Sequence, residues 1–237
     1  MTTLHPSLNG ARACVFDAGG TLVHPDWPRL AGLAEEFAGR RLSEEEMRRA
    51  FGEMLKSVGA GSQAPGGRVI DQTGPHWTFR AMYGGLGLDE DACESLVGRI
   101  DAAHAERHVW CGVDPEAAGV IDELKRAGLL VAVISNTEDG RLRDSLGAAG
   151  LSEKFDLLID SHLVGCRKPD AAIFRLALGQ LGVEAKDAAF VGDSYAHDAL
   201  AARAAGMRAV LLDPLDLHPE AVCPRIRRLG DLLRGGV

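Results

Sequence analysis

The second half of the chain alternates between short apolar runs and amphipathic stretches, and this alternation constrains the fold more than any other feature. Four apolar runs predict buried strands, at residues 129–136, 155–161, 188–194 and 207–213. Helical patterns separate these runs, at residues 139–150, 170–182 and 196–206. Strands and helices that alternate at this spacing are typical of βαβ units and a parallel sheet. The apolar run at 14–18 is expected to join that sheet.

Between the first predicted strand and the next, the pattern changes. From residue 26 to about 108 there is no strong strand signal, but several stretches are amphipathic. Ser43 and Glu46 have the spacing of a capping box at the start of a helix. Two further helices and one loop are expected, at residues 76–84, 91–107 and 59–67.

With 237 residues, the chain is long enough for a core domain and a smaller inserted domain. We therefore predict an α/β fold whose core is a Rossmann-like parallel sheet with helices on both faces. Residues 1–24 and 110–237 would form this core, and residues 25–109 would form the helical insert.

The overall charge and the cysteine content exclude several classes of protein. A net charge of −8 argues against a nucleic-acid partner, although a small anionic substrate is still compatible with an acidic chain. No run of 18 or more apolar residues occurs, and the N-terminus lacks a signal-peptide pattern, so no membrane association is expected. Five dispersed cysteines, an odd number, favour reduced thiols and a cytoplasmic location. The oligomeric state has no sequence signal.

Polar residues stand where several predicted strands end, and ligands bind at the carboxyl ends of the strands in an open parallel sheet. These residues are Asp17, Ser135 with Asn136, Lys168, and Asp193 with Asp198. Their types fit phosphoryl chemistry: a carboxylate can attack phosphorus, and a lysine and a hydroxyl can hold the charged phosphate oxygens. Further carboxylates can bind a hard cation such as Mg²⁺.

Four stretches, 15–23, 133–151, 165–183 and 191–207, together resemble the motifs of the haloacid dehalogenase-like hydrolase superfamily, in the order that its members show. The resemblance implies that Asp17 is the nucleophile. It also implies that Ser135, with Asn136, binds the phosphoryl group and that Lys168 stabilises the charged intermediate. The helical insert lies where members with a C1-type cap domain carry that cap.

The same resemblance implies a Mg²⁺ cofactor. Its ligands would be Asp17, the backbone carbonyl of Gly19, and Asp193, with Asp198 helping directly or through water. Taken together, these features predict a magnesium-dependent phosphatase that acts on a small phosphate ester through an aspartyl-phosphate at Asp17.

Gly19 departs from the family pattern, because phosphatases of the superfamily carry a second Asp at this position. That Asp is the general acid for the leaving group and the base for hydrolysis of the aspartyl-phosphate, and such help is worth roughly 10²–10⁴ in rate. A glycine carbonyl can still bind the metal but cannot transfer a proton. His24 and Asp26 follow the first motif closely and are candidates to replace the missing acid.

Gly19 keeps three other functions open. A 2-haloacid dehalogenase uses its aspartate without a metal or a second Asp. A phosphonatase-type hydrolase uses a cap lysine, for which Lys56 is the candidate, since it is the lone lysine between residues 24 and 110. A catalytically impaired protein could bind a phosphorylated metabolite or another protein without turnover.

Histidine and tryptophan residues in the insert give weaker signals. His104 and His108 have metal-like i, i+4 spacing without an evident third ligand, so an exposed helix face is expected. Trp27, Trp77 and Trp110 are expected to pack in the hinge or the cap, with lining of the substrate as the alternative.

Overall fold

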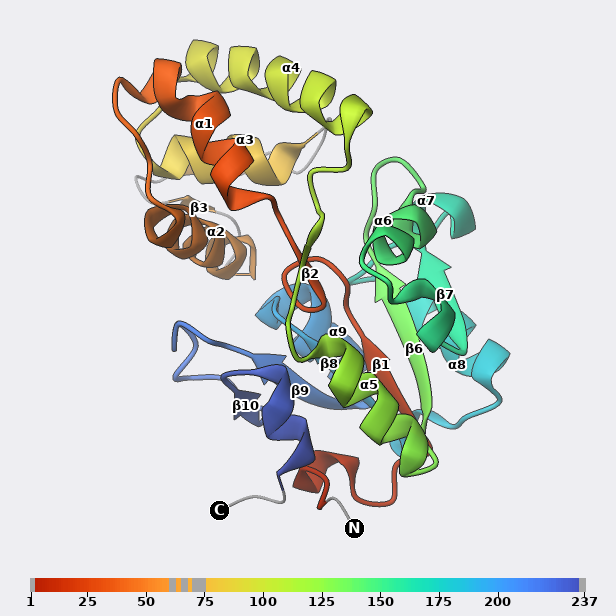
Figure 1. Ribbon diagram of the computed structural model, residues 1–237. Helices are drawn as coiled ribbons and strands as arrows, with labels where there is room; N and C mark the ends of the chain where they lie inside the picture. Colours follow the sequence, from red (N-terminus) through yellow and green to blue (C-terminus); the bar gives the residue numbers. More distant parts are fainter. Residues whose placement is uncertain (1–2, 60–62, 65–67, 70–75, 235–237) are drawn as a thin grey trace. The chain divides into compact units, whose positions relative to one another are not determined.

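The computed structural model describes residues 3–59, 63–64, 68–69 and 76–234. The chain divides into two compact units (Figure 1). Residues 1–24 and 112–237 form one, here called the core unit, and residues 25–111 form the other, the helical unit. The division thus falls between residues 111 and 112, two residues after the boundary expected from the sequence.

The core unit is built on one six-stranded parallel sheet with the order β10-β9-β8-β1-β6-β7. Its strands are β1 (Ala13–Phe16), β6 (Leu130–Ser135), β7 (Leu157–Asp160), β8 (Ala188–Gly192), β9 (Arg208–Leu212) and β10 (Arg225–Ile226). The central β1 pairs with both β6 and β8, so that Val15 lies between Ala132 and Phe190. All five strands predicted from the sequence are present, and the short β10 was not predicted.

Helices cover both faces of this sheet, as predicted. They include α5 (Ala117–Arg126), α6 (Leu142–Ala148), α8 (Ala171–Leu181) and α9 (Ala201–Ala204). Side chains alternate between the faces of a strand, and in β1 Phe16 packs with residues of α5 and α6 while Val15 packs with residues of α8 and α9. The burial of both faces explains why the strands read as continuous apolar runs.

A short antiparallel pair links the sheet to the helical unit. It consists of β2 (Val23–His24) and β5 (Gly112–Val113), with Val23 opposite Val113. These strands directly flank the helical unit in the chain.

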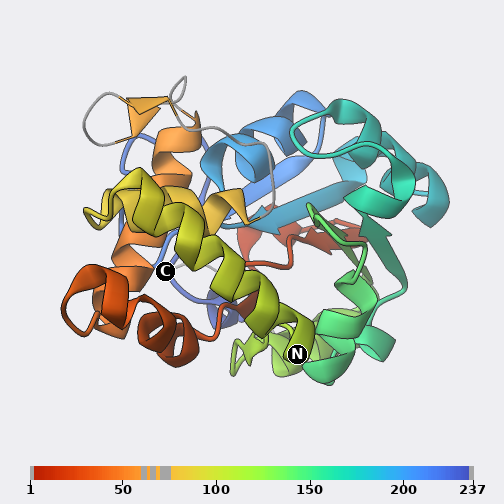
Figure 2. The same ribbon diagram turned by 90° about the horizontal axis from the view of Figure 1, so that it is seen from above.

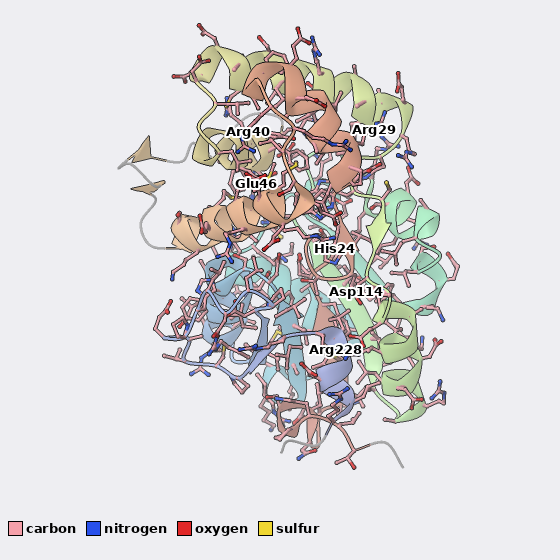
Figure 3. All side chains as sticks on the ribbon, turned by 60° about the vertical axis from the view of Figure 1, so that its left-hand side comes forward. His24, Arg29, Arg40, Glu46, Asp114 and Arg228 are labelled. Carbon is pink, nitrogen blue, oxygen red and sulfur yellow. The ribbon has the colours of Figure 1, made fainter. Side chains whose placement is uncertain are left out.

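The helical unit contains α1 (Trp27–Ala38), α2 (Glu44–Gly59), α3 (Trp77–Gly85) and α4 (Glu90–Glu106) (Figure 2). The predicted capping box of α2 is present: Ser43 N donates to Glu46 Oε2 at 2.8 Å, and Glu46 N donates to Ser43 Oγ at 3.2 Å. Arg40 forms an ion pair with the same glutamate, with 2.9 Å between Arg40 Nη2 and Glu46 Oε1 (Figure 3). Two short strands, β3 (Gln63–Ala64) and β4 (Arg68–Val69), pair where a loop was predicted over 59–67. Residues 60–62 and 65–67 of that loop lie outside the described residues.

The tryptophans pack in the core of the helical unit, together with Phe51. Trp27 and Trp77 are buried, and the Trp27 and Trp110 rings each contact the Phe51 ring edge-on, at 5.7 and 5.8 Å between centroids. None of the described helices is both long and apolar enough to span a bilayer.

The expectation of an exposed face for His104 and His108 is wrong, because both side chains are half-buried. The chain turns back against α4 after its last residue, so that Val109 N donates to His104 Nδ1 and Trp110 N donates to His108 Nδ1, both at 3.3 Å. The two imidazole rings lie 4.3 Å apart between centroids.

Candidate functional site

The carboxyl end of the central strand positions Asp17. Its backbone N–H donates to Val191 O of β8 at 2.9 Å, which continues the ladder one residue beyond β1. The residue is 6% exposed, and Lys168 Nζ lies 2.6 Å from its Oδ1. The same ammonium group lies 2.7 Å from Asp198 Oδ1. Three residues predicted for the site, from three separate segments, therefore meet in one buried cluster.

Asn136 fixes the backbone of Lys168 from the neighbouring segment. Its side-chain amide donates to Lys168 O at 2.9 Å, and its Oδ1 accepts from Lys168 N at 2.9 Å. These two bonds use one donor and one acceptor of the amide, and they hold the backbone of Lys168 beside Asn136. Ser135, the preceding residue, is buried at the end of β6 and lies opposite Asp160 in the sheet register. Phosphoryl binding by Ser135 and Asn136 stays a prediction.

The segment after β8 is a wide π-helical turn over Tyr195–Leu200, followed by the short α9, in place of the regular helix predicted over 196–206. Ala199 N donates to Ser194 O at 3.2 Å, one residue further along than in an α-helix. Asp198 Oδ2 accepts from Ser194 N at 2.9 Å, which holds the carboxylate inside the turn. A β-carbon at Gly192 would lie 2.4 Å from that Oδ2, so this position must lack a side chain.

Asp17, Asp193 and Asp198 form a carboxylate cluster in which one oxygen from each residue lies within 4.8 Å of the others. Burial raises the pKa of Asp17 to about 6, against the lowering effect of Lys168. Burial, and then the other two carboxylates, raise the pKa of Asp193 well above its usual range. Burial alone would lower the pKa of Lys168, but Asp17 and Asp198 outweigh it and raise that pKa.

This cluster fits a hard divalent cation. Three carboxylates and one ammonium group leave an excess of negative charge, which adds to the effect of burial in raising the pKa of Asp193. Lys168 pairs with Asp17 and Asp198, and the described residues provide no ion pair to Asp193. Carboxylate oxygens are the ligands that Mg²⁺ prefers, so these three residues suit it.

The backbone at Gly20 lies very close to the Asp193 carboxylate of this cluster. Gly20 has a φ of +87°, and a β-carbon built there would lie 1.9 Å from Asp193 Oδ2. Only glycine adopts this conformation without strain and leaves this space. The close approach of Asp193 therefore explains why the first motif has a glycine at position 20.

Gly20→Ala should displace Asp193 and weaken Mg²⁺ binding at the metal site predicted from the sequence by at least about tenfold, a loss equivalent to about 1.4 kcal/mol. Gly10→Ala is the matched control, because Gly10 has a similar φ of +69° but open space around its missing β-carbon. Both variants should lose about 1 kcal/mol of unfolding free energy from the backbone strain. Calorimetric titration with Mg²⁺ separates them, and equal affinities in the two variants would contradict the steric argument.

His24 and Asp26, the two candidates for the missing acid, have different surroundings. His24 Nε2 lies 3.8 Å from Asp114 Oδ2 within the core unit. Asp26 caps α1 by accepting from Arg29 N at 3.2 Å, and it also binds the guanidinium group of Arg107. Asp26 thus has a structural role in the helical unit. Lys56, the candidate for a phosphonatase-type reaction, has an exposed side chain on α2.

Two residues near the site were not predicted. Asp160 organises the chain after β6, because its carboxylate accepts from Leu142 N at 3.1 Å, from His162 N at 3.0 Å and from the hydroxyl of Thr137. Its place at the end of the 155–161 strand was the signal available in the sequence. Thr21 is fully buried, and its hydroxyl lies 3.4 Å from Asp17 Oδ2.

Comparisons with known proteins agree with this geometry. A family profile described as haloacid dehalogenase-like hydrolase matches residues 11–206. A protein named phosphoserine phosphatase from Thermus thermophilus is 42% identical over 120 residues. The match covers 50% of this chain and 47% of the relative, so the chain spans about half the length of that curated relative. A protein named as a phosphatase from Mycobacterium tuberculosis is 30% identical over 229 residues, covering 94% of this chain and 97% of the relative. A solved dehalogenase structure is similar with a TM-score of 0.63 and 25% identity, covering 94% of this chain and 95% of that one.

Proposed function

Because the chain belongs to the haloacid dehalogenase-like hydrolase family, we propose that it is a magnesium-dependent phosphatase that hydrolyses a small phosphate ester. The observation that carries the proposal is the buried Asp17 carboxylate, paired with Lys168 and grouped with two further carboxylates. The relative named as a phosphatase, which aligns over 94% of this chain, supports a phosphate ester as the substrate.

In this reaction Asp17 attacks the phosphorus in line with the leaving oxygen and forms an aspartyl-phosphate. Lys168 stabilises the negative charge that develops on the phosphoryl oxygens, and Ser135 with nearby backbone N–H groups holds those oxygens. Water then attacks the phosphorus, the bond to Asp17 breaks, and the carboxylate is restored. Asn136 keeps Lys168 in place through its two hydrogen bonds to the Lys168 backbone.

The ligands for Mg²⁺ would be Asp17, Asp193 and Asp198, with the backbone carbonyl of Gly19. When bound there, Mg²⁺ supplies positive charge that polarises the phosphoryl group. The same charge would offset the repulsion within the carboxylate cluster.

We assign the helical unit the role of a C1-type cap that selects a small phosphorylated substrate. Its insertion between β2 and β5, two short strands of the core unit, supports this role. A cytoplasmic location stays a prediction from the odd number of dispersed cysteines.

The protein should release p-nitrophenolate from p-nitrophenyl phosphate in the presence of Mg²⁺, and EDTA should lower the rate by at least about 10²-fold. A catalytic metal supplies several kcal/mol of transition-state stabilisation, and each 1.36 kcal/mol corresponds to about a factor of ten in rate. Adding excess Mg²⁺ back should restore turnover. Turnover that survives chelation would contradict the metal-dependent mechanism.

A 2-haloacid dehalogenase is the second candidate, favoured by Gly19 and by the similarity to a solved dehalogenase structure. Asp17 would then displace halide from carbon, without a need for a metal. Halide release from chloroacetate in the presence of EDTA, with no hydrolysis of p-nitrophenyl phosphate, would select this function. The three grouped carboxylates favour the phosphatase, because they have no role in a metal-free displacement.

A further inference from the structure

The proposed phosphatase reaction needs a proton donor that Gly19 cannot provide, and the local backbone indicates which residue replaces it. After Asp17 the chain turns sharply back on itself. Leu22 N and Val23 N both donate to Ala18 O, at 2.8 and 3.0 Å, and Gly20 N donates to Val23 O at 2.7 Å. Gly19 and Val23 consequently form a β-bridge and lie side by side.

His24 is the next residue after this bridge. Paired strand segments lie about 4.8 Å apart, and one residue step adds about 3.8 Å. The α-carbon of His24 therefore lies no more than about 8.6 Å from that of Gly19, where the family carries its acid, and this distance is within reach of a side chain and a bound ester. Val23 is 2% exposed and packs in the core of the sheet, whereas the side chain of His24 is 21% exposed. Alternation along the strand thus directs His24 away from that core.

Asp114 lies beside the imidazole, directly after the partner strand β5. Asp114 N donates to Leu22 O at 3.0 Å, and His24 pairs with Gly112, so Asp114 is the diagonal cross-strand neighbour of His24. Asp114 Oδ2 lies 3.8 Å from His24 Nε2, and Asp114 Oδ1 accepts from Glu116 N at 2.8 Å (Figure 3). One carboxylate oxygen is therefore fixed by the backbone while the other faces the ring.

A histidine with one nitrogen toward a fixed carboxylate has the arrangement of an oriented acid–base group. The carboxylate of Asp114 offsets the positive charge of the protonated ring. The second ring nitrogen, Nδ1, is then the atom that exchanges a proton with the substrate.

We propose that His24 is the general acid and base of this phosphatase, in place of the carboxylate that Gly19 lacks, and that Asp114 is its positioning residue. This inference rests on the proposed function. As the bond between phosphorus and the ester oxygen breaks, protonated His24 gives its proton to that oxygen, and the alcohol leaves. Neutral His24 then takes a proton from the water that attacks the aspartyl-phosphate. Inorganic phosphate, the Asp17 carboxylate and protonated His24 are the products of this second step.

The test compares leaving groups in the wild-type protein and in His24→Gln. For ethyl phosphate, whose alkoxide is a poor leaving group, kcat/KM should fall by about 10² or more. For p-nitrophenyl phosphate, which needs no acid, kcat/KM should change by less than about threefold. Its kcat should fall, because water attack on the aspartyl-phosphate loses its base. A burst of p-nitrophenolate and a protein mass raised by one phosphoryl group should then mark the accumulated intermediate.

Three further variants isolate the role of the imidazole. Asp114→Asn should shift the ratio of the two kcat/KM values in the same direction, but less. Gly19→Asp, made in the His24→Gln protein, should restore hydrolysis of ethyl phosphate. Gly19 does not have a positive φ, so its backbone conformation is open to residues other than glycine. His76→Gln is the matched control, because it removes a histidine that pairs with Asp101 in the helical unit, and it should leave the ratio unchanged.

The possible outcomes are distinct. If His24→Gln lowers kcat/KM equally for both esters, or for neither, the inference is wrong while the phosphatase function stands. If the wild-type protein and Asp17→Asn are equally inactive toward both esters, the proposed function itself fails. Calorimetric binding of Mg²⁺ and thermal unfolding should be the same in His24→Gln and the wild-type protein. Should His24→Gln fail to fold, His24→Asn is tested in the same way.

Discussion

Asp17→Asn should reduce the hydrolysis of p-nitrophenyl phosphate by at least about 10³-fold, because the amide cannot attack phosphorus. The substitution keeps the shape of the side chain and removes one charge from the carboxylate cluster. Lys168 retains its contact with Asp198 at 2.7 Å, so its buried ammonium group stays paired. Steady-state rates in saturating Mg²⁺ measure the effect.

The fold should tolerate this change, and that separates a chemical role from a structural one. Burial, with a smaller effect of the Asp198 carboxylate, disfavours the charged form of Asp17 by more than Lys168 favours it, so a neutral residue should cost less than about 1 kcal/mol of unfolding free energy. Asp122→Asn is the matched control: it removes a carboxylate of the core unit that pairs with Lys154 at 2.7 Å, and the rate should stay within about twofold of wild type. Retained turnover in Asp17→Asn would contradict the role of Asp17 as nucleophile.

The strands, and the grouping of several candidate site residues, were predictable because each leaves a local mark in the sequence. Burial on both faces makes each strand a continuous apolar run, and the polar residue that ends the run marks the carboxyl edge. Asp17, Lys168 and Asp198 were assigned in this way, and the structure brings all three together. The capping box at Ser43 and Glu46 is local in the same sense.

What the sequence did not reveal depends on contacts between distant residues. The pairing of His24 with Asp114 requires β2 to meet β5, about 90 residues later in the chain. The amide of Asn136 can form hydrogen bonds with a phosphate or with backbone groups. Only the fold shows that it bonds to the backbone of Lys168. A π-helical turn stands around Asp198 in place of a regular helix, and the Asp198 carboxylate accepts from Ser194 N within it. The period of the apolar residues carries no sign of such a side-chain bond.

Lys168→Met should have the largest effect on stability as well as a large effect on rate. Methionine fills a similar volume but leaves Asp17 and Asp198 buried without their cation. Removing one partner of a buried ion pair costs about 3–5 kcal/mol, so in the absence of metal the unfolding free energy should fall by about that amount. Loss of one preorganised charge at the transition state should lower kcat by about 10²–10³-fold.

Added Mg²⁺ should separate these two losses. In the proposed site the cation binds only the folded carboxylate cluster, so it should add stability as its concentration exceeds its Kd, by about 2.7 kcal/mol at 100 times Kd. Thermal or urea unfolding of Lys168→Met should therefore recover with Mg²⁺, and by more than that of the wild-type protein, because the variant cluster carries one more uncompensated negative charge. Turnover should not recover, since the proposed mechanism needs the missing ammonium group at the phosphoryl oxygens. Lys154→Met, which breaks the partly exposed pair with Asp122, should cost no more than about 1 kcal/mol and leave the rate unchanged. If Lys168→Met and Lys154→Met prove equally stable without metal, the buried lysine does not hold the cluster together.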